Sequence, residues 1–215
     1  KNAQKSGEVT PQNSFLRECA LTECLETAER ASHYSRKRRE YAAERTRVGR
    51  YKKGIGLASS IHNAGGAKIH KSDGIGTILK LDDYARATII TGASEIGQGI
   101  DAVVTLIVAE ELGIPVEHVT IVNNDSDIAP WDVGVHASRT TFIAGNGARR
   151  AAHKARAQIF KGAEKHLGEP AQSLDLRSGW VVREKCGTPL IKLERLLRQM
   201  HFQPEPELVM VTDYY

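Results

Sequence analysis

Hydrophobic and polar positions repeat with a helical period in two long segments of the chain. The clearer one follows Gly99, where apolar residues recur every three or four positions. Gly113 and Pro115 come directly after it, and both residue types are typical of the positions that follow a helix. A second helical segment carries a stripe of alanines and contains Gly145 and Gly147, which would permit close approach of a neighbouring element. We therefore predict helices at residues 100–112 and 142–167.

Shorter apolar runs separated by Gly, Asp and Ser indicate strands that pair through tight turns. The predicted strands are residues 55–58, 67–70, 76–81, 84–91, 118–123, 174–177, 180–184 and 208–211. Further helices are expected from Ser14, with Ser14 as the N-cap, through 28–44 as a continuation or a restart, and at 191–200. The pattern predicts an α+β fold in which antiparallel hairpins pack with two long helices.

The composition of the chain indicates a soluble, globular protein. Hydrophobic residues make up 40% and charged residues 26% of the 215 positions, and no apolar run reaches 18 residues. The three cysteines form no metal-ligand pattern, so we expect reduced thiols in a cytoplasmic protein. The chain begins without a Met or a signal peptide and ends directly after an apolar run, so we expect a fragment of a longer chain.

Positive charge is concentrated in residues 36–53, where nine of 18 residues are Lys or Arg. We assign residues 1–53 to a helical basic arm and residues 54–215 to a second domain. Such a run can meet nucleic acid or an acidic partner, and it can equally be a solvated helix face. Apart from Tyr41 and Tyr51 it lacks aromatic residues for base stacking, so we favour the solvated face and do not expect nucleic acid.

A glycine-rich turn at residues 92–99 joins a predicted strand to the helix at 100–112. Its sequence is Gly-Ala-Ser-Glu-Ile-Gly-Gln-Gly, and it lacks the Lys-Ser/Thr of a P-loop. Glycines permit close approach of a ligand, and a helix N-terminus offers unpaired N–H groups to an anion. Gln98 adds a side-chain amide that both donates and accepts. The alternative is that this turn is simply a tight connection.

A second loop precedes the helix at 142–167 and carries small hydroxyl residues. Ser138 and Thr140 can cap that helix, or they can face the same anion as Gln98. Asp125 and Asp127 lie in the loop before it, but the remaining ligands of an EF-hand are missing, so we reject a calcium site.

These segments together resemble a known enzyme family. The turn at 92–99, the run Val-Ala-Glu-Glu-Leu-Gly-Ile-Pro at 108–115 and the run His-Ala-Ser-Arg-Thr-Thr at 136–141 resemble the molybdenum-binding large subunit of the xanthine oxidase family of molybdenum hydroxylases. The segment Pro-x-Asp-x-Gly at 130–134 is most similar to 4-hydroxybenzoyl-CoA reductase alpha subunits. The resemblance covers about residues 54–215 and implies part of the second molybdenum-cofactor-binding domain.

The resemblance also implies a cofactor site made of two loops. Gly97, Gln98 and Gly99 match the segment that contacts the pterin-phosphate part of the molybdenum cofactor. The second loop matches the family's other contact segment, which holds the dinucleotide through Ala137, Ser138, Arg139 and Thr140. In bacterial relatives the cofactor is usually the cytosine dinucleotide form of molybdenum-molybdopterin.

The family's catalytic glutamate stands in a Gly-Val-Gly-Glu type motif that this sequence lacks, and Glu95 and Glu184 are no substitutes for it. We therefore expect no catalytic residue and no metal ligand in this chain. The resemblance implies an oxidoreductase that acts on a small molecule. Its partners would be the remaining part of the molybdenum subunit, an iron–sulfur subunit and an FAD subunit. The alternative is a non-catalytic module that binds phosphate or acidic ligands and is recruited by its basic arm.

Overall fold

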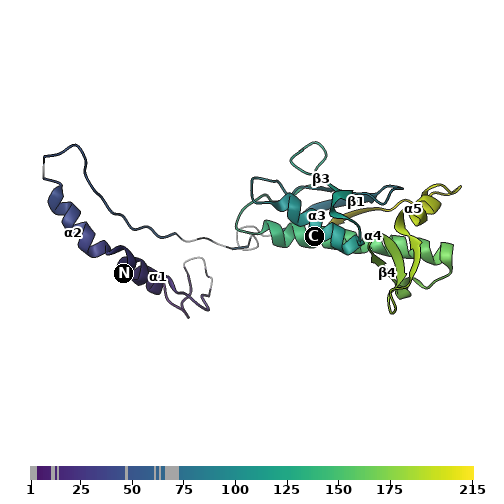
Figure 1. Cartoon of the computed structure of the whole chain (residues 1–215), viewed down its shortest axis with the longest axis horizontal. Coiled ribbons are helices and arrows are strands. Elements are labelled where there is room, and N and C mark those ends of the chain that lie inside the picture. The colour runs from purple at the N-terminus through teal and green to yellow at the C-terminus, as the bar shows by residue number, and fades with distance from the viewer. Residues whose placement is uncertain are drawn as a thin grey trace. The chain divides into compact units, whose positions relative to one another are not determined.

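The structure is a computed structural model, and it describes residues 4–10, 13, 15–46, 48–60, 62, 64–65 and 73–215. Contacts divide the chain into two compact units, Lys1–Ile61 and His62–Tyr215, of which the second is drawn in teal to yellow (Figure 1). The domain bounds of 1–53 and 54–215 stay a prediction. Each unit is described by itself below.

The first unit contains two helices, α1 (Leu21–Ser32) and α2 (Tyr34–Glu44). They meet at His33, whose left-handed φ of 51° ends α1, so the predicted restart is confirmed. The predicted start near Ser14 is wrong, because α1 begins at Leu21 and Phe15 forms an isolated β-bridge with Val9 instead. Ser14 itself lies outside the described residues. No residue of α1 or α2 is fully buried.

Two predicted strands of the region between the helices and the sheet are absent or untested. Residues 55–58 are described and form no strand, so that prediction is wrong. An extended segment needs a neighbouring strand to satisfy its backbone groups, and residues 54–60 pair with none of the seven strands. The predicted strand at 67–70 lies outside the described residues.

The second unit is built on a four-stranded sheet with the order β3-β2-β1-β7. Its strands are β1 (Gly76–Leu81), β2 (Ala87–Thr91), β3 (Val119–Val122) and β7 (Met210–Tyr214). The predicted hairpin of β1 and β2 is confirmed. The chain then crosses through α3 (Ile100–Leu112), a helix predicted with the same bounds, so that β3 lies parallel to β2. The α+β class is confirmed, with one parallel pair added to the antiparallel ones.

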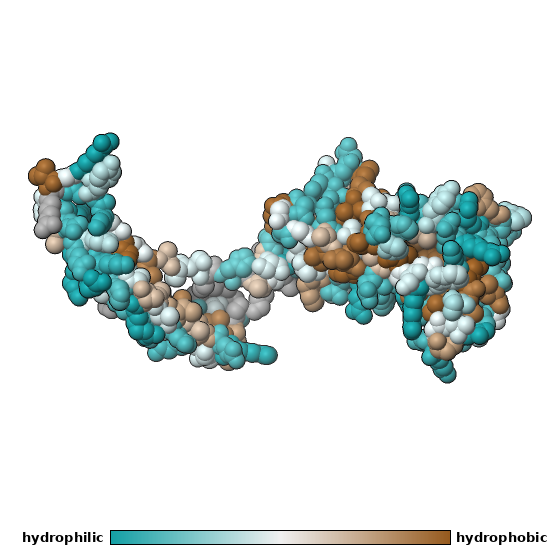
Figure 2. All heavy atoms as spheres, viewed as in Figure 1, coloured by the Kyte–Doolittle hydropathy of each residue, from teal (hydrophilic) through white to brown (hydrophobic). Residues whose placement is uncertain are grey.

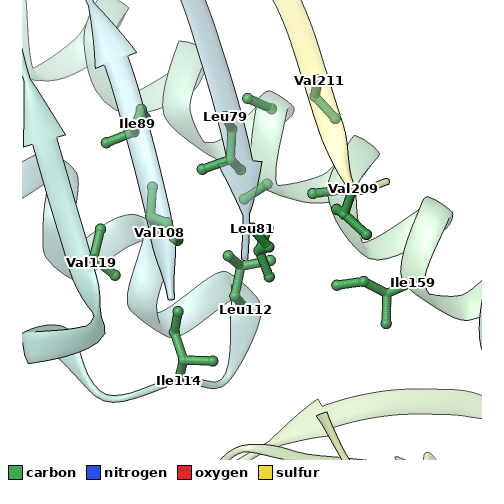
Figure 3. Close-up of a cluster of buried hydrophobic side chains, with 14 of the residues drawn as sticks. Leu79, Leu81, Ile89, Val108, Leu112, Ile114, Val119, Ile159, Val209 and Val211 are labelled. Carbon is green, nitrogen blue, oxygen red and sulfur yellow. The ribbon is translucent and has the colours of Figure 1, made fainter. Parts of the chain in front are cut away.

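The helix α4 (Thr140–Leu167) lies beside α3, and both cover the same sheet (Figure 1). Its predicted stripe of small residues is buried along the whole helix. Gly147 allows this close packing, since a Cβ there would lie 2.9 Å from Cγ2 of Ile75. Figure 3 shows the resulting core, in which strand residues such as Leu79, Ile89 and Val211 meet Val108 and other residues of the helices.

A smaller antiparallel sheet follows α4, with the order β4-β5-β6. It comprises β4 (Leu174–Arg177), β5 (Trp180–Arg183) and β6 (Pro189–Lys192), and it leads into α5 (Leu193–His201). The short 3-10 helices η1 (Val116–His118) and η2 (Ala171–Ser173) precede β3 and β4. Sequence patterning missed β6 and placed the start of α5 two residues early. The last strand, β7, pairs with β1 and runs further than the predicted 208–211.

The surface of the two units differs in character. Figure 2 shows the first unit as largely hydrophilic and the second with larger hydrophobic patches. Among the described residues, no helix combines the length and the apolar character that a membrane crossing requires.

Candidate functional site

The loop between β2 and α3 presents an exposed backbone. Gly97 and Gly99 have φ values of 100° and 81°, which L-residues with a side chain rarely adopt. A Cβ at either position would meet no atom within 4 Å, so both glycines face open space. Gln98 between them is exposed as well. The backbone of residues 97–99 is therefore accessible to a ligand.

The N-terminus of α3 already holds an anion, the carboxylate of Glu95. Its Oε1 accepts hydrogen bonds from the N–H groups of Gly97 (2.6 Å) and Gly99 (3.1 Å), and its Oε2 accepts one from Asp101 (3.2 Å). The bonds from Gly99 and Asp101 lower the pKa of Glu95. The sequence predicted a ligand anion at this helix start, whereas the structure shows the side chain of Glu95 from the same loop in that place.

The side chain of Gln98 closes back on the loop. Its Oε1 accepts a hydrogen bond from the N–H of Ile96 (2.7 Å), and its Nε2 donates to the carbonyl oxygen of Ser94 (2.9 Å). A side-chain amide has two N–H groups and two lone pairs, so one of each remains for another molecule. Gln98 can thus be oriented by its own loop and still bind a ligand.

Two asparagines that directly follow β3 hold this loop in place through side-chain hydrogen bonds. Asn124 accepts a hydrogen bond from the N–H of Glu95 (3.2 Å) and donates to its carbonyl oxygen (3.4 Å). Asn123 Nδ2 donates to the carbonyl oxygen of Ala93 (2.8 Å) and to Oδ1 of Asp101 (2.6 Å). Sequence reasoning missed both residues, because their contacts bridge about 30 positions of chain.

The second predicted loop contains two adjacent residues in the left-handed region. Ala137 has a φ of 48° and Ser138 a φ of 54°, each at a cost of about 1–3 kcal/mol for a residue with a Cβ. Ser138 is exposed, and its Oγ lies 3.3 Å from Nε2 of His62. Thr140 is buried as the first residue of α4, and the N-cap of that helix, Arg139, makes no side-chain capping bond.

Arg139 points its guanidinium group into the protein, where its side chain is only 1% exposed. Nε contacts Oδ1 of Asp73 (2.5 Å), and Nη1 donates to Oδ1 of Asp132 (2.8 Å). Nη1 and Nη2 also donate to the carbonyl oxygens of Gly134 (2.8 Å) and Gly74 (3.1 Å). Every guanidinium nitrogen is engaged in this way, so the charge of Arg139 is not offered to a ligand at the second loop.

Asp132 connects the two loops. Gly92, where the first loop begins, lies directly against it, since a Cβ at position 92 would be 2.7 Å from Cβ of Asp132. The same aspartate binds Arg139 of the second loop. Its other carboxylate oxygen, Oδ2, is buried and has no hydrogen-bond partner among the described residues. The fold thus joins two segments that the sequence separates by about 40 residues.

Comparison with known proteins identifies the family of the chain that carries these two loops. A family model described as "Molybdopterin cofactor-binding domain" matches residues 27–215. The chain belongs to this family. The match extends over all of the second unit and into α1 of the first, so it includes both candidate loops.

Several relatives and solved structures agree with this membership. The xanthine dehydrogenase molybdenum-binding subunit of Escherichia coli O157:H7 is 29% identical over 212 residues, which are 95% of this chain and 27% of the relative. The probable hypoxanthine oxidase of Escherichia coli K12 is 32% identical over 169 residues, 79% of this chain and 17% of the relative. This chain therefore spans about a quarter or less of the length of these relatives.

Two solved structures share the fold. Quinoline 2-oxidoreductase from Pseudomonas putida 86 superposes with a TM-score of 0.66 at 17% identity, covering 97% of this chain and 28% of that one. Carbon monoxide dehydrogenase from Oligotropha carboxidovorans gives a TM-score of 0.63 at 22% identity, covering 90% of this chain and 26% of that one. At these identities the likeness establishes the fold alone.

The hydrogen-bonding groups of the two loops can be compared with those of a molybdopterin cofactor. A pterin offers ring N–H donors and acceptors. Gln98 retains one donor and one acceptor, and Oδ2 of Asp132 is a buried acceptor without a partner in the described part of the chain. Within residues 4–10, 13, 15–46, 48–60, 62, 64–65 and 73–215, no three His, Cys, Asp or Glu side chains form a metal-binding cluster. The residues present therefore fit an organic cofactor that is bound through hydrogen bonds.

Proposed function

We propose that the chain binds a molybdenum-molybdopterin cofactor through Gly97, Gln98 and Gly99 of one loop and Ala137, Ser138, Arg139 and Thr140 of the other. The observation that carries this proposal is the family match over residues 27–215, which includes two loops joined through Asp132. In such an enzyme the bound cofactor would supply the redox chemistry, in which oxygen is exchanged between water and an sp2 carbon of the substrate. This chain contributes positioning and electrostatics.

The residues of the second loop have different proposed roles. Ser138 is exposed and offers its hydroxyl, while Ala137 and Thr140 are buried and offer backbone groups. Arg139 contributes by positioning the loop, because its guanidinium group is bound to Asp73 and Asp132 and its backbone N–H and carbonyl groups pair with His136 and Ile143. This division assigns to single residues the amide and hydroxyl contacts that the resemblance implies for the loop as a whole.

We further propose that the chain acts within a multi-subunit oxidoreductase of aromatic, heterocyclic or aldehyde substrates. Its relatives include one subunit of the 6-hydroxypseudooxynicotine dehydrogenase complex of Paenarthrobacter nicotinovorans and one of the nicotinate dehydrogenase of Pseudomonas putida. A hydroxybenzoyl-CoA reductase-like reaction stays a prediction, because the names of these relatives state other substrates. The cytosine dinucleotide form, the iron–sulfur and FAD partners and a cytoplasmic location, in keeping with three free cysteines, belong to the same proposal.

The substitution Gln98→Ala tests this function. It removes the side-chain hydrogen bonds available to a ligand, each worth about 0.5–1.5 kcal/mol, so cofactor occupancy should fall several-fold. Molybdenum and pterin content would be measured in the full-length protein from a molybdenum-replete source. Gln158→Ala is the matched control, because Gln158 is also exposed and donates to a carbonyl oxygen, that of Met210. Absence of both molybdenum and pterin from the unsubstituted protein would exclude the proposal.

One observation supports a second candidate function, the binding of a polyanion by the first unit. A hollow of about 460 Å³ there is lined by Arg38, Arg45, Lys52 and Lys53 together with Tyr41. Four cations around one hollow raise the local concentration of anions. This function concerns the basic arm and is independent of the cofactor loops.

A further inference from the structure

The start of α3 has the features of a phosphate site but already contains a negative charge. Three N–H groups converge there, those of Gly97, Gly99 and Asp101. Aligned N–H groups and the helix dipole favour one anion at such a place. In this structure the carboxylate of Glu95 accepts all three hydrogen bonds.

The position of this carboxylate is fixed by the loop and by the neighbouring strand. The backbone of Glu95 exchanges two hydrogen bonds with the side chain of Asn124, a residue with a left-handed φ of 58° at the end of β3. Asn123 binds the carbonyl oxygen of Ala93, two residues before Glu95, and the carboxylate of Asp101 in the first turn of α3. The backbone of Glu95 is therefore fixed by Asn124, while its carboxylate points at the N-terminus of α3.

A ligand phosphate would have to displace this carboxylate to reach the same N–H groups. Two unit charges 4 Å apart repel by about 1 kcal/mol in water and by about 4 kcal/mol near a protein surface. Hydrogen bonds from Gly99 and Asp101 lower the pKa of Glu95, so it remains ionised at neutral pH. Both glycines have positive φ values where their N–H groups meet Glu95, a conformation that residues with a Cβ rarely adopt.

We propose that Glu95 is a positioning residue, an internal anion that occupies the N-terminus of α3, excludes phosphate from it and, through the N–H groups of Gly97 and Gly99, fixes the backbone on either side of Gln98. The loop then recognises neutral hydrogen-bonding groups of its ligand, and any ligand phosphate lies elsewhere. The role toward Gln98 rests on the proposed function, whereas the exclusion of phosphate does not.

Titration of the 215-residue chain followed by amide NMR tests the carboxylate contact. The amide shifts of Gly97, Gly99 and Asp101 should change together as the pH falls, with one midpoint below the ordinary range of a glutamate. In the variant Glu95→Gln this shared transition should be absent. Independent midpoints, or a shared midpoint at or above the ordinary glutamate value, would overturn the proposal.

Inorganic phosphate at neutral pH tests the exclusion. Phosphate should leave these three amide shifts unchanged in the unsubstituted chain and should move them saturably in Glu95→Ala. Saturable shifts in the unsubstituted chain would contradict the proposal, and so would their absence in a Glu95→Ala variant whose remaining spectrum shows the native fold. Glu110→Gln, an exposed substitution on the same helix, should behave like the unsubstituted chain in both titrations.

Cofactor content tests the link to Gln98. Glu95→Gln should lower the molybdenum and pterin content several-fold, as Gln98→Ala does, while Glu110→Gln should not. If the unsubstituted protein binds cofactor and Glu95→Gln binds it equally well, the positioning role is wrong and the proposed function stands. If no protein binds cofactor but both titrations succeed, the proposed function fails and the internal anion remains.

Discussion

At the scale of single residues, Arg139 shows that residue type alone does not determine a role. An arginine in a loop that resembles a dinucleotide-binding segment suggests a charge offered to phosphate. Here the guanidinium group is buried between Asp73 and Asp132 and donates to two carbonyl oxygens as well. Two residues in the left-handed region, Ala137 and Ser138, directly precede Arg139, at the point where the chain turns and the arginine side chain enters the interior.

Replacing Arg139 by Met should destabilise the fold strongly. The substitution leaves two carboxylates buried without their cation, and breaking a buried ion pair costs about 3–5 kcal/mol. Urea unfolding of the 215-residue chain measures the free energy of unfolding.

Arg149→Met is the matched control for this measurement. Arg149 pairs with Glu111, but its side chain is 59% exposed, so the expected loss is at most about 1 kcal/mol. Equal losses for the two substitutions would show that Arg139 is not the buried anchor that the structure shows.

At the scale of elements, α4 shows how a glycine can serve packing and not flexibility. Gly145 and Gly147 both lie in the first half of the helix and both are buried. A glycine in a helix costs about 0.5–1 kcal/mol relative to alanine, so each of the two lowers the intrinsic stability of α4. The neighbouring atoms differ: Gly147 faces the β-branched side chains of Ile75, just before β1, and Thr77 of β1, whereas Gly145 faces the end of the Ile107 side chain on α3.

The two glycines should therefore respond with opposite signs to alanine. A Cβ at Gly147 would lie 2.9 Å from Ile75 and 3.0 Å from Oγ1 of Thr77, so Gly147→Ala should lower the free energy of unfolding by about 1–2 kcal/mol despite better propensity. A Cβ at Gly145 would lie 3.1 Å from Cδ1 of Ile107, which can move. Gly145→Ala should raise the free energy of unfolding by up to about 1 kcal/mol. Chemical denaturation measures both, and a gain at Gly147 would contradict the packing described.

At the scale of the whole molecule, the two units differ in what stabilises them. The described hydrophobic core, from Ile75 to Val211, lies entirely in the second unit, whereas α1 and α2 of the first unit bury no residue completely. Burial of apolar surface is the main favourable term in folding, so the second unit should carry nearly all of the stability.

A chain shortened to His62–Tyr215 tests this division. It should unfold cooperatively with a Tm within about 4 °C of the full chain, the shift expected for about 1 kcal/mol in a domain of this size. If the basic arm binds polyanions, the full chain should bind an oligonucleotide with a steep salt dependence and the shortened chain should not. Loss of cooperative unfolding would contradict the division, and retained oligonucleotide binding would exclude the arm as the binding element.

Local sequence signals were enough to predict several elements of the fold. The bounds of α3 follow from its apolar period and from Gly113, and the course of α4 follows from its alanine stripe. The β1–β2 hairpin follows from two apolar runs around an Asp-Asp turn. Family motifs in the two loops were readable for the same reason, since each is contiguous in the chain.

Features that depend on a distant partner were set by the tertiary structure. Residues 55–58 have the composition of a strand but no neighbouring strand in the described part of the chain, and β6 forms beside β5 where the pattern predicted the start of a helix at residue 191. The direction of the Arg139 side chain depends on Asp73, 66 residues away, and the position of Glu95 depends on Asn124, 29 residues away. Side-chain direction and hydrogen-bond partners follow from where the fold places those distant residues, and no local pattern carries that information.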